Sequence, residues 1–187
     1  MLLGGAFEKT YVPTLGVEVH PVAVKTTSGD VVFKVWDVAG QDKLGGLRDA
    51  YYLQANAAII FYDVTSHESY KNVALWHRGV FGVNKDMPCV LVGNKACSSR
   101  SVAPRAVTFH RKKNIFACEL DVKPRTAGAQ ADLHMWLPLL FIARKLLRKP
   151  DLNFLHADGS EMNVAPLAVV AAVAGDDGQS DADESED

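Results

Sequence analysis

The sequence predicts an α/β protein built on a doubly wound, mostly parallel sheet. Apolar runs of strand length alternate with longer amphipathic segments between residues 18 and 147, the order expected when helices cover both faces of a sheet. Polar side chains follow directly on two of these apolar runs, at Asp37 and at Asn94. Because open α/β sheets bind ligands at the carboxyl ends of their strands, these two positions predict a binding site.

The first two predicted strands form a hairpin. Residues 18–26 and 30–37 largely alternate apolar and polar side chains, as half-buried strands do. Residues 27–30 between them read Thr-Ser-Gly-Asp, residue types that favour a tight turn. We therefore expect an antiparallel pair at the start of the sheet.

The middle of the chain predicts a strand, a helix and a second strand. Residues 57–64 form a nearly continuous apolar run, which indicates a strand buried on both faces. Residues 66–83 favour a helix, and residues 88–93 form the next apolar strand. The side chains expected on the inner face of the helix are Tyr70, Val73, Ala74 and Trp76.

A final strand over residues 116–121 precedes a small-residue loop, residues 124–130, and a long helix. Pro138 is expected in the first turn of that helix, where a missing N–H costs little. Its predicted core face comprises Leu139, Leu140, Ile142, Ala143, Leu146 and Leu147. Its predicted basic face comprises Arg144, Lys145, Arg148 and Lys149.

Length and composition predict one domain with an acidic tail. A chain of 187 residues with 48% apolar content can bury one good core. The net charge of −2 conceals an uneven distribution, because residues 176–187 hold seven acidic side chains and no basic one. The three cysteines lie in or beside apolar runs, which favours free thiols in a reducing compartment. With no signal-peptide pattern and no apolar run of about 20 residues, we expect a soluble intracellular protein.

The stretch at residues 34–41, Lys-Val-Trp-Asp-Val-Ala-Gly-Gln, has the chemistry of a phosphoryl-transfer site. Asp37 stands where a strand meets a charged ligand. Gly40 lacks a Cβ, so its N–H can approach a phosphate oxygen closely. Gln41 can hold a water molecule with its amide.

These residues resemble the Asp-x-x-Gly-Gln motif of the Ras-like small GTPases. Further motifs, at residues 7–21, 45–49, 109–114 and 143–146, are similar to one branch of that family, the nuclear transport GTPases of the Ran type. The order and spacing of the motifs extend the resemblance over roughly residues 6–155. The implied fold is that of the P-loop small GTPases, with residues 1–155 as the GTPase domain and residues 156–187 as a tail.

The resemblance implies a set of site residues for GTP or GDP and Mg²⁺. Gln41 would be catalytic, orienting the water that converts GTP to GDP. Thr14 and Asp37 would be the Mg²⁺ ligands, and residues 42–52 would form the second switch with its short helix. The residues implied to contact the nucleotide are Tyr11, Thr14, Gly40, Asn94, Lys95 and Lys123.

The chain departs from the family at two nucleotide contacts. Residues 4–10 contain glycines and a Lys-Thr pair, but Glu8 stands where the phosphate loop requires a glycine before the lysine. Cys97 stands where the family's guanine-reading Asp is expected, and a thiol is a poor acceptor for the two hydrogen bonds that Asp would take. The resemblance therefore implies that this sequence lacks the family's first strand and its phosphate loop.

The lacking strand has a structural consequence. In the family it lies between the strand that ends at Asp37 and the strand over residues 57–64. We therefore expect those two strands either to leave backbone N–H and C=O groups unpaired or to close up on each other.

The sequence also predicts surfaces and partners. The basic run at residues 110–113, His-Arg-Lys-Lys, fits a solvated face, and the resemblance implies contacts there with acidic partners. The implied partners of the monomer are importin-like and exportin-like transport receptors and Ran regulators, without direct nucleic-acid or membrane binding, in nucleus and cytoplasm. In the tail, residues 165–174 predict a short helix and residues 175–187 disorder.

Two hypotheses of different classes follow. The first is a Ran-like GTP-binding protein of nuclear import and export with impaired nucleotide binding. The second is a nucleotide-free interaction module, or the product of an incomplete gene, that keeps Ran-like surfaces for transport proteins. The departures from the family at the phosphate loop and at Cys97 favour the second hypothesis as the account of how the protein works. A Gly-rich phosphate loop encoded upstream of Met1 would favour the first.

Overall fold

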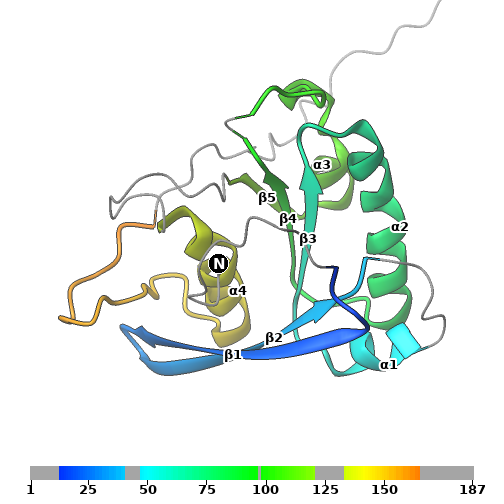
Figure 1. Cartoon of the computed structure of the whole chain (residues 1–187). Coiled ribbons are helices and arrows are strands. Elements are labelled where there is room, and N and C mark those ends of the chain that lie inside the picture. Colours follow the sequence, from blue (N-terminus) through cyan, green and yellow to red (C-terminus); the bar gives the residue numbers. More distant parts are fainter. Residues whose placement is uncertain (1–12, 41–46, 97, 121–132, 165–187) are drawn as a thin grey trace, which may run out of the picture.

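The computed structural model describes residues 13–40, 47–96, 98–120 and 133–164 (Figure 1). In chain order the elements are β1 (Val17–Thr26), β2 (Gly29–Val38), α1 (Leu47–Gln54), β3 (Ala58–Asp63), α2 (His67–Val83), β4 (Cys89–Asn94), the 3₁₀ turn η2 (Pro104–Ala106), α3 (Phe109–Lys113), β5 (Phe116–Glu119) and α4 (Leu133–Leu147). No helix in these ranges is long and apolar enough to cross a membrane. The expectations for residues 4–10, 124–130 and 165–187 fall outside the described part.

The predicted hairpin is confirmed. Strands β1 and β2 pair antiparallel from Val17 opposite Val38 to Thr26 opposite Gly29. The turn needs a glycine, because Gly29 has a φ of 106°. The Thr26 hydroxyl donates to the Gly29 carbonyl (2.6 Å) and accepts from the Ser28 N–H (3.0 Å), so one side chain closes the turn.

Strands β3, β4 and β5 form a parallel sheet in that order. The register places Tyr62, Gly93 and Glu119 side by side across the three strands. A Cβ added to Gly93 would lie 2.7 Å from the Tyr62 hydroxyl, so the tyrosine side chain lies against β4 only because that position is glycine.

Helix α4 joins the two sheets. One buried cluster packs its residues Leu139, Leu140 and Ala143 with β1 and with Phe154. A second cluster packs Ile142 on the buried face of β4 and β5. Helix α2 covers the opposite face of the parallel sheet, where Val73 is buried. Figure 1 shows α4 between the hairpin and the parallel sheet, with α2 on the far side.

The predicted single doubly wound sheet is wrong in one respect. The described strands form two sheets, β1-β2 and β3-β4-β5, and β2 does not hydrogen-bond to β3. Ala58 N–H donates to Pro88 and Val64 N–H to Asn94, so the even-numbered residues of β3 face β4. The backbone groups of Ile59 and Phe61 therefore point to the other edge. Of the two expected outcomes, β2 and β3 do not close up on each other, and no other strand of the described residues pairs with the edges that they leave.

Several burial predictions also need correction. Phe61 is 44% exposed, because α4 packs mainly on β4 and β5 and leaves the edge strand partly uncovered. Ala74 is exposed, since the inner face of α2 runs through Val73 and Val80. Leu146 and Leu147 are exposed in the last turn of α4.

Pro138 lies inside α4, not in its first turn. The helix begins at Leu133, five residues earlier, and the proline side chain is fully buried. Apolar burial compensates here for the missing backbone hydrogen bond.

Candidate functional site

The carboxyl end of β2 brings together two residues predicted to bind Mg²⁺. The Thr14 hydroxyl donates to Oδ2 of Asp37 at 2.9 Å, although 23 residues separate them. The loop before β1 turns at Gly16, whose φ is 79°, and its carbonyl accepts from the Ala39 N–H at 2.8 Å. The hydroxyl and carboxylate oxygens are suitable ligands for Mg²⁺. In the described residues no cluster of three or more His, Cys, Asp or Glu side chains could hold a metal, so this pair supplies only part of a coordination shell.

Gly40 follows this pair at the end of β2. It is exposed, and a Cβ at this position would meet no atom within 4 Å, so its backbone is open to a ligand. Three other residues of the predicted site, Tyr11, Gln41 and Lys123, lie outside the described residues, as does Cys97, which stands where the family's guanine-reading Asp is expected. The roles of all four stay predictions.

The carboxyl ends of β3 and β4 form a second polar group. Asn94 ends β4, and its Oδ1 accepts the Lys95 N–H at 2.8 Å. Lys95 has a left-handed backbone, with a φ of 65°, and the next N–H, of Ala96, donates to the Leu120 carbonyl just after β5. The Lys95 ammonium forms an ion pair with the carboxylate of Asp63, the last residue of β3.

Asp63 was missed by the sequence analysis. Burial alone would raise its pKa, but hydrogen bonds from Lys95 and Thr65 outweigh burial and lower the pKa below the ordinary value. Its Oδ1 accepts both the N–H (2.8 Å) and the hydroxyl (2.7 Å) of Thr65. The signal that could have found it was its place at the end of an apolar strand parallel to the strand ending at Asn94.

A buried ion pair braces the loop that carries Lys95. The two carboxylate oxygens of Glu119 accept from Arg100 at 2.7 Å each, and Glu119 is 4% exposed. Hydrogen bonding to Glu119 raises the pKa of Arg100. Ala96 N–H donates to the Leu120 carbonyl, and Val102 N–H to the Val64 carbonyl, so both ends of the loop are tied to the sheet. This bracing positions the second polar group on a rigid support.

The two polar groups come from different sheets. In Figure 1 the carboxyl end of β2 lies low in the view near α1, whereas the carboxyl ends of β3 and β4 lie at the top. No hydrogen bond among the described residues joins Thr14 or Asp37 to Asn94 or Lys95.

The predicted basic run lies in a short helix that precedes strand β5. Residues 109–113 form α3, and His110 is fully buried while Arg111, Lys112 and Lys113 are exposed. The Tyr70 hydroxyl of α2 accepts the N–H groups of Thr108 and Phe109, which fixes the start of α3. Only three of the four predicted basic side chains therefore reach solvent.

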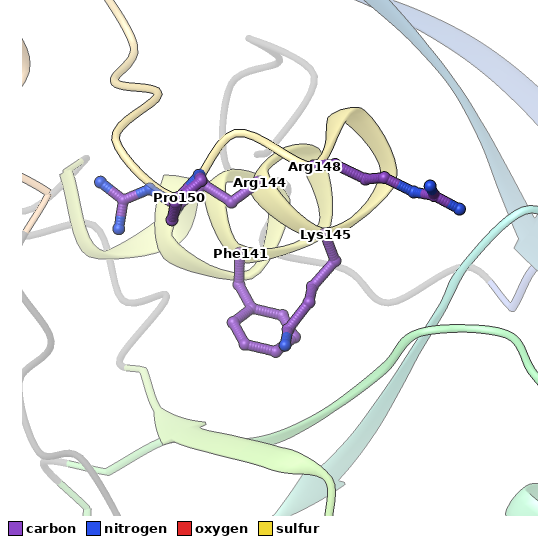
Figure 2. Close-up of a pocket in the computed structure, with 5 residues that line it drawn as sticks. All are labelled: Phe141, Arg144, Lys145, Arg148 and Pro150. Atoms are coloured by element: carbon purple, nitrogen blue, oxygen red, sulfur yellow. The ribbon is translucent and has the colours of Figure 1, made fainter.

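A second basic surface lies at the end of α4. Five residues line an open hollow of about 400 Å³: Phe141, Arg144, Lys145, Arg148 and Pro150. Figure 2 shows Phe141 and Lys145 pointing to the same side of the helix, and the Lys145 ammonium lies 5.6 Å from the centre of the Phe141 ring. Arg144 is held by the Leu152 carbonyl and by Oδ1 of Asn153.

The parallel sheet, its covering helices and the polar groups at the strand ends define a mixed α/β protein of the Ras-like kind. Residues 2–135 match the model of the Ras family, which spans well over half of the chain, and the chain belongs to the Ras family of small GTPases. Members of this family typically bind a guanine nucleotide with Mg²⁺. The Thr14–Asp37 pair fits the metal, and Asn94 with Lys95 occupies the end of β4 where the family's base motif is expected.

Proposed function

We propose that this chain is a Ran-like GTP-binding protein of nucleocytoplasmic transport with weakened nucleotide binding. The observation that carries the proposal is the hydrogen bond between Thr14 and Asp37, the two residues to which the resemblance assigns Mg²⁺. It supports a metal-binding end of β2 beside Gly40 and the Gln41 that would orient water.

The weakening follows from residue chemistry. The phosphates of Ras-like proteins are held by a Gly-rich loop and its lysine, and Glu8 interrupts the nearest similar pattern, at residues 4–10. At the base, Cys97 cannot accept the two hydrogen bonds that distinguish guanine from adenine; each is worth roughly 1.5–3 kcal/mol to a charged acceptor.

Calorimetry of the 187-residue chain with GTP, GDP and ATP in Mg²⁺ tests this proposal. We expect neither GTP nor GDP to bind with the tight affinity of the family, and little preference for guanine over adenine. Cys97→Asp should raise the guanine preference without restoring tight binding, because it leaves the phosphates unsupported. Tight, guanine-selective binding by the parent chain would show a working GTPase instead.

The proposed partners and location follow the resemblance. The chain would bind importin-like and exportin-like receptors and Ran regulators as a monomer, in nucleus and cytoplasm, without direct contact to nucleic acid or membrane. The exposed side chains of Arg111, Lys112 and Lys113 on α3 suit acidic surfaces on such proteins.

A second candidate function is a nucleotide-free interaction module. The departures from the family at residues 4–10 and at Cys97 favour it, because they affect the contacts to the phosphates and to the base. Receptor capture separates the two functions. A module should bind a receptor equally with GTP, with GDP and after chelation of Mg²⁺, whereas a GTP-dependent protein should bind preferentially with GTP.

A further inference from the structure

The ion pair between Asp63 and Lys95 crosses the ends of two neighbouring strands. Asp63 and Asn94 are partners in the β3–β4 register, and Lys95 follows Asn94 directly. The left-handed backbone of Lys95 lets its side chain reach back to β3, where the ammonium meets the carboxylate. The four methylene groups of Lys95 therefore run along the carboxyl edge of the parallel sheet.

Both ends of this lysine are fixed. At the backbone, its N–H donates to Asn94 Oδ1 and its carbonyl accepts from the Ser98 N–H at 2.9 Å. At the far end, the carboxylate of Asp63 is oriented by Thr65, and the Asp63 N–H donates to the Ser69 hydroxyl at 2.9 Å. The carboxylate that receives the ammonium is thus oriented by two hydrogen bonds from the adjoining turn.

The arrangement changes what the lysine offers to a ligand. The side chain of Lys95 is 52% exposed and that of Asp63 is 24% exposed, so the ligand-accessible part is mainly lysine. Because the ammonium is paired with Asp63, Lys95 is held at its charged end and offers a ligand its methylene stem rather than a free cation. Such a stem suits the flat face of an aromatic ring better than a phosphate group.

We propose that Asp63 is a positioning residue that holds the Lys95 stem as a platform for the purine ring. The inference rests on the proposed function, because it assumes that the base binds at the end of β4. It assigns to Asp63 a role in base affinity that acts through Lys95, and it predicts that phosphate binding does not depend on this pair.

The test is a double-mutant cycle with Asp63→Asn, Lys95→Met and the double variant. The conservative Asn keeps the shape of Asp63 without its charge, and Met keeps the length of the stem without the ammonium. Asp158→Asn is the matched control, because Asp158 also accepts an N–H and a hydroxyl, from Ser160, but lies in the segment after α4.

The first readout needs no nucleotide. Nitrogen-15 NMR of the lysine ammonium groups should show one ordered Lys95 signal in the parent chain and in Asp158→Asn, and lose it in Asp63→Asn. A Lys95 signal that is equally averaged in the parent and in Asp63→Asn would overturn the positioning role.

The second readout is the affinity for guanosine, which has no phosphate, and for inorganic triphosphate. We expect Asp63→Asn to weaken guanosine binding about fivefold to tenfold in the parent background and less than twofold in the Lys95→Met background. Triphosphate binding should stay unchanged or rise, since a freed ammonium attracts anions.

The outcomes separate this inference from the proposed function. Equal losses of guanosine affinity in both backgrounds, or equal losses for guanosine and triphosphate, would overturn the role of Asp63 while leaving nucleotide binding intact. An ordered ammonium signal with no guanosine or GDP binding to the parent chain would overturn the proposed function, and the base platform with it.

Discussion

The two sheets of the molecule are built on opposite principles. The hairpin β1–β2 has one face on α4 and one in solvent, so Val22 and Val24 are buried while Val32 is 60% and Trp36 40% exposed. The parallel sheet is covered on both faces at its centre, and every β4 residue from Cys89 to Gly93 is buried. The difference teaches that Asn94 and Lys95, the proposed base contacts, lie at the end of a strand that is buried on both faces. Thr14 and Asp37, the proposed metal ligands, lie instead at the end of a hairpin that is buried on one face.

Two backbone hydrogen bonds tie the turn end of the hairpin to the segment after α4. Thr27 N–H donates to the Asn153 carbonyl at 3.0 Å, and Leu155 N–H to the Lys25 carbonyl at 2.9 Å. Phe154 between them is fully buried and makes edge contacts with Phe33 and Trp136. At the other end of the hairpin, the ring centre of Trp36 lies 5.7 Å from that of Tyr51 in α1.

The largest expected effect comes from removing Phe154, a buried side chain that packs the hairpin against α4. Phe154→Ala should cost about 3–5 kcal/mol of unfolding free energy, because it empties a fully buried site next to α4 and β2. Hydrogen exchange should then show lost protection in β1 and β2 before β4. Phe61→Ala is the control, with an expected cost of about 1 kcal/mol because Phe61 is half-exposed. Uniform loss of protection across both sheets would show that they unfold as one unit.

The second-largest effect is expected from breaking the ion pair between Arg100 and Glu119 beside the parallel sheet. Arg100→Met leaves the Glu119 carboxylate buried without its bidentate partner, which should cost about 2–4 kcal/mol. Urea unfolding measures the loss, and Arg105→Met on the exposed turn η2 is the control. A cost for Arg100→Met no larger than for Arg105→Met would mean that the ion pair contributes nothing.

The third prediction compares the stability cost of the same substitution, valine to threonine, in the two sheets. Val92→Thr places a hydroxyl in a fully buried site on β4 and should cost about 1–3 kcal/mol. Val32→Thr on the solvent face of the hairpin should change stability by less than about 0.5 kcal/mol. Thermal unfolding of both variants measures the contrast, and equal costs would contradict the one-sided account of the hairpin.

Sequence patterns predicted the local elements well, because turns and apolar runs depend on near neighbours. The Thr-Ser-Gly-Asp turn placed the hairpin, and the uninterrupted apolar run placed β4. The interior position of Pro138 could not be found this way, since the burial that compensates for its lost hydrogen bond depends on packing across the fold.

The site was predicted in part. Thr14 and Asp37 came from a motif, and the structure brings them together. Asp63 has no motif, and its contact with Lys95 depends on β3 and β4 being parallel neighbours in one register. The burial of His110 likewise depends on which face of α3 meets the core, which a run of four basic residues does not reveal.

The smallest expected effect is a pH dependence at the end of the parallel sheet. The folded protein holds the pKa of Asp63 below the ordinary value, which is about 4 in an unfolded chain. A lowered pKa means that the unfolded state binds the proton more readily, so this carboxylate stabilises the fold fully above about pH 4. That contribution is lost as the pH falls through the folded-state pKa.

Urea unfolding at pH 7 and near pH 3 measures this contribution. Stability should fall with acid in the parent chain, and Asp63→Asn should reduce the fall, because asparagine does not titrate. Lys95→Met should reduce it as well, since it removes one hydrogen bond that lowers the Asp63 pKa, whereas the bonds from Thr65 remain. The decrease should be small because both partners are partly in solvent. An identical acid dependence in all three chains would show that the Asp63–Lys95 pair does not stabilise the parallel sheet.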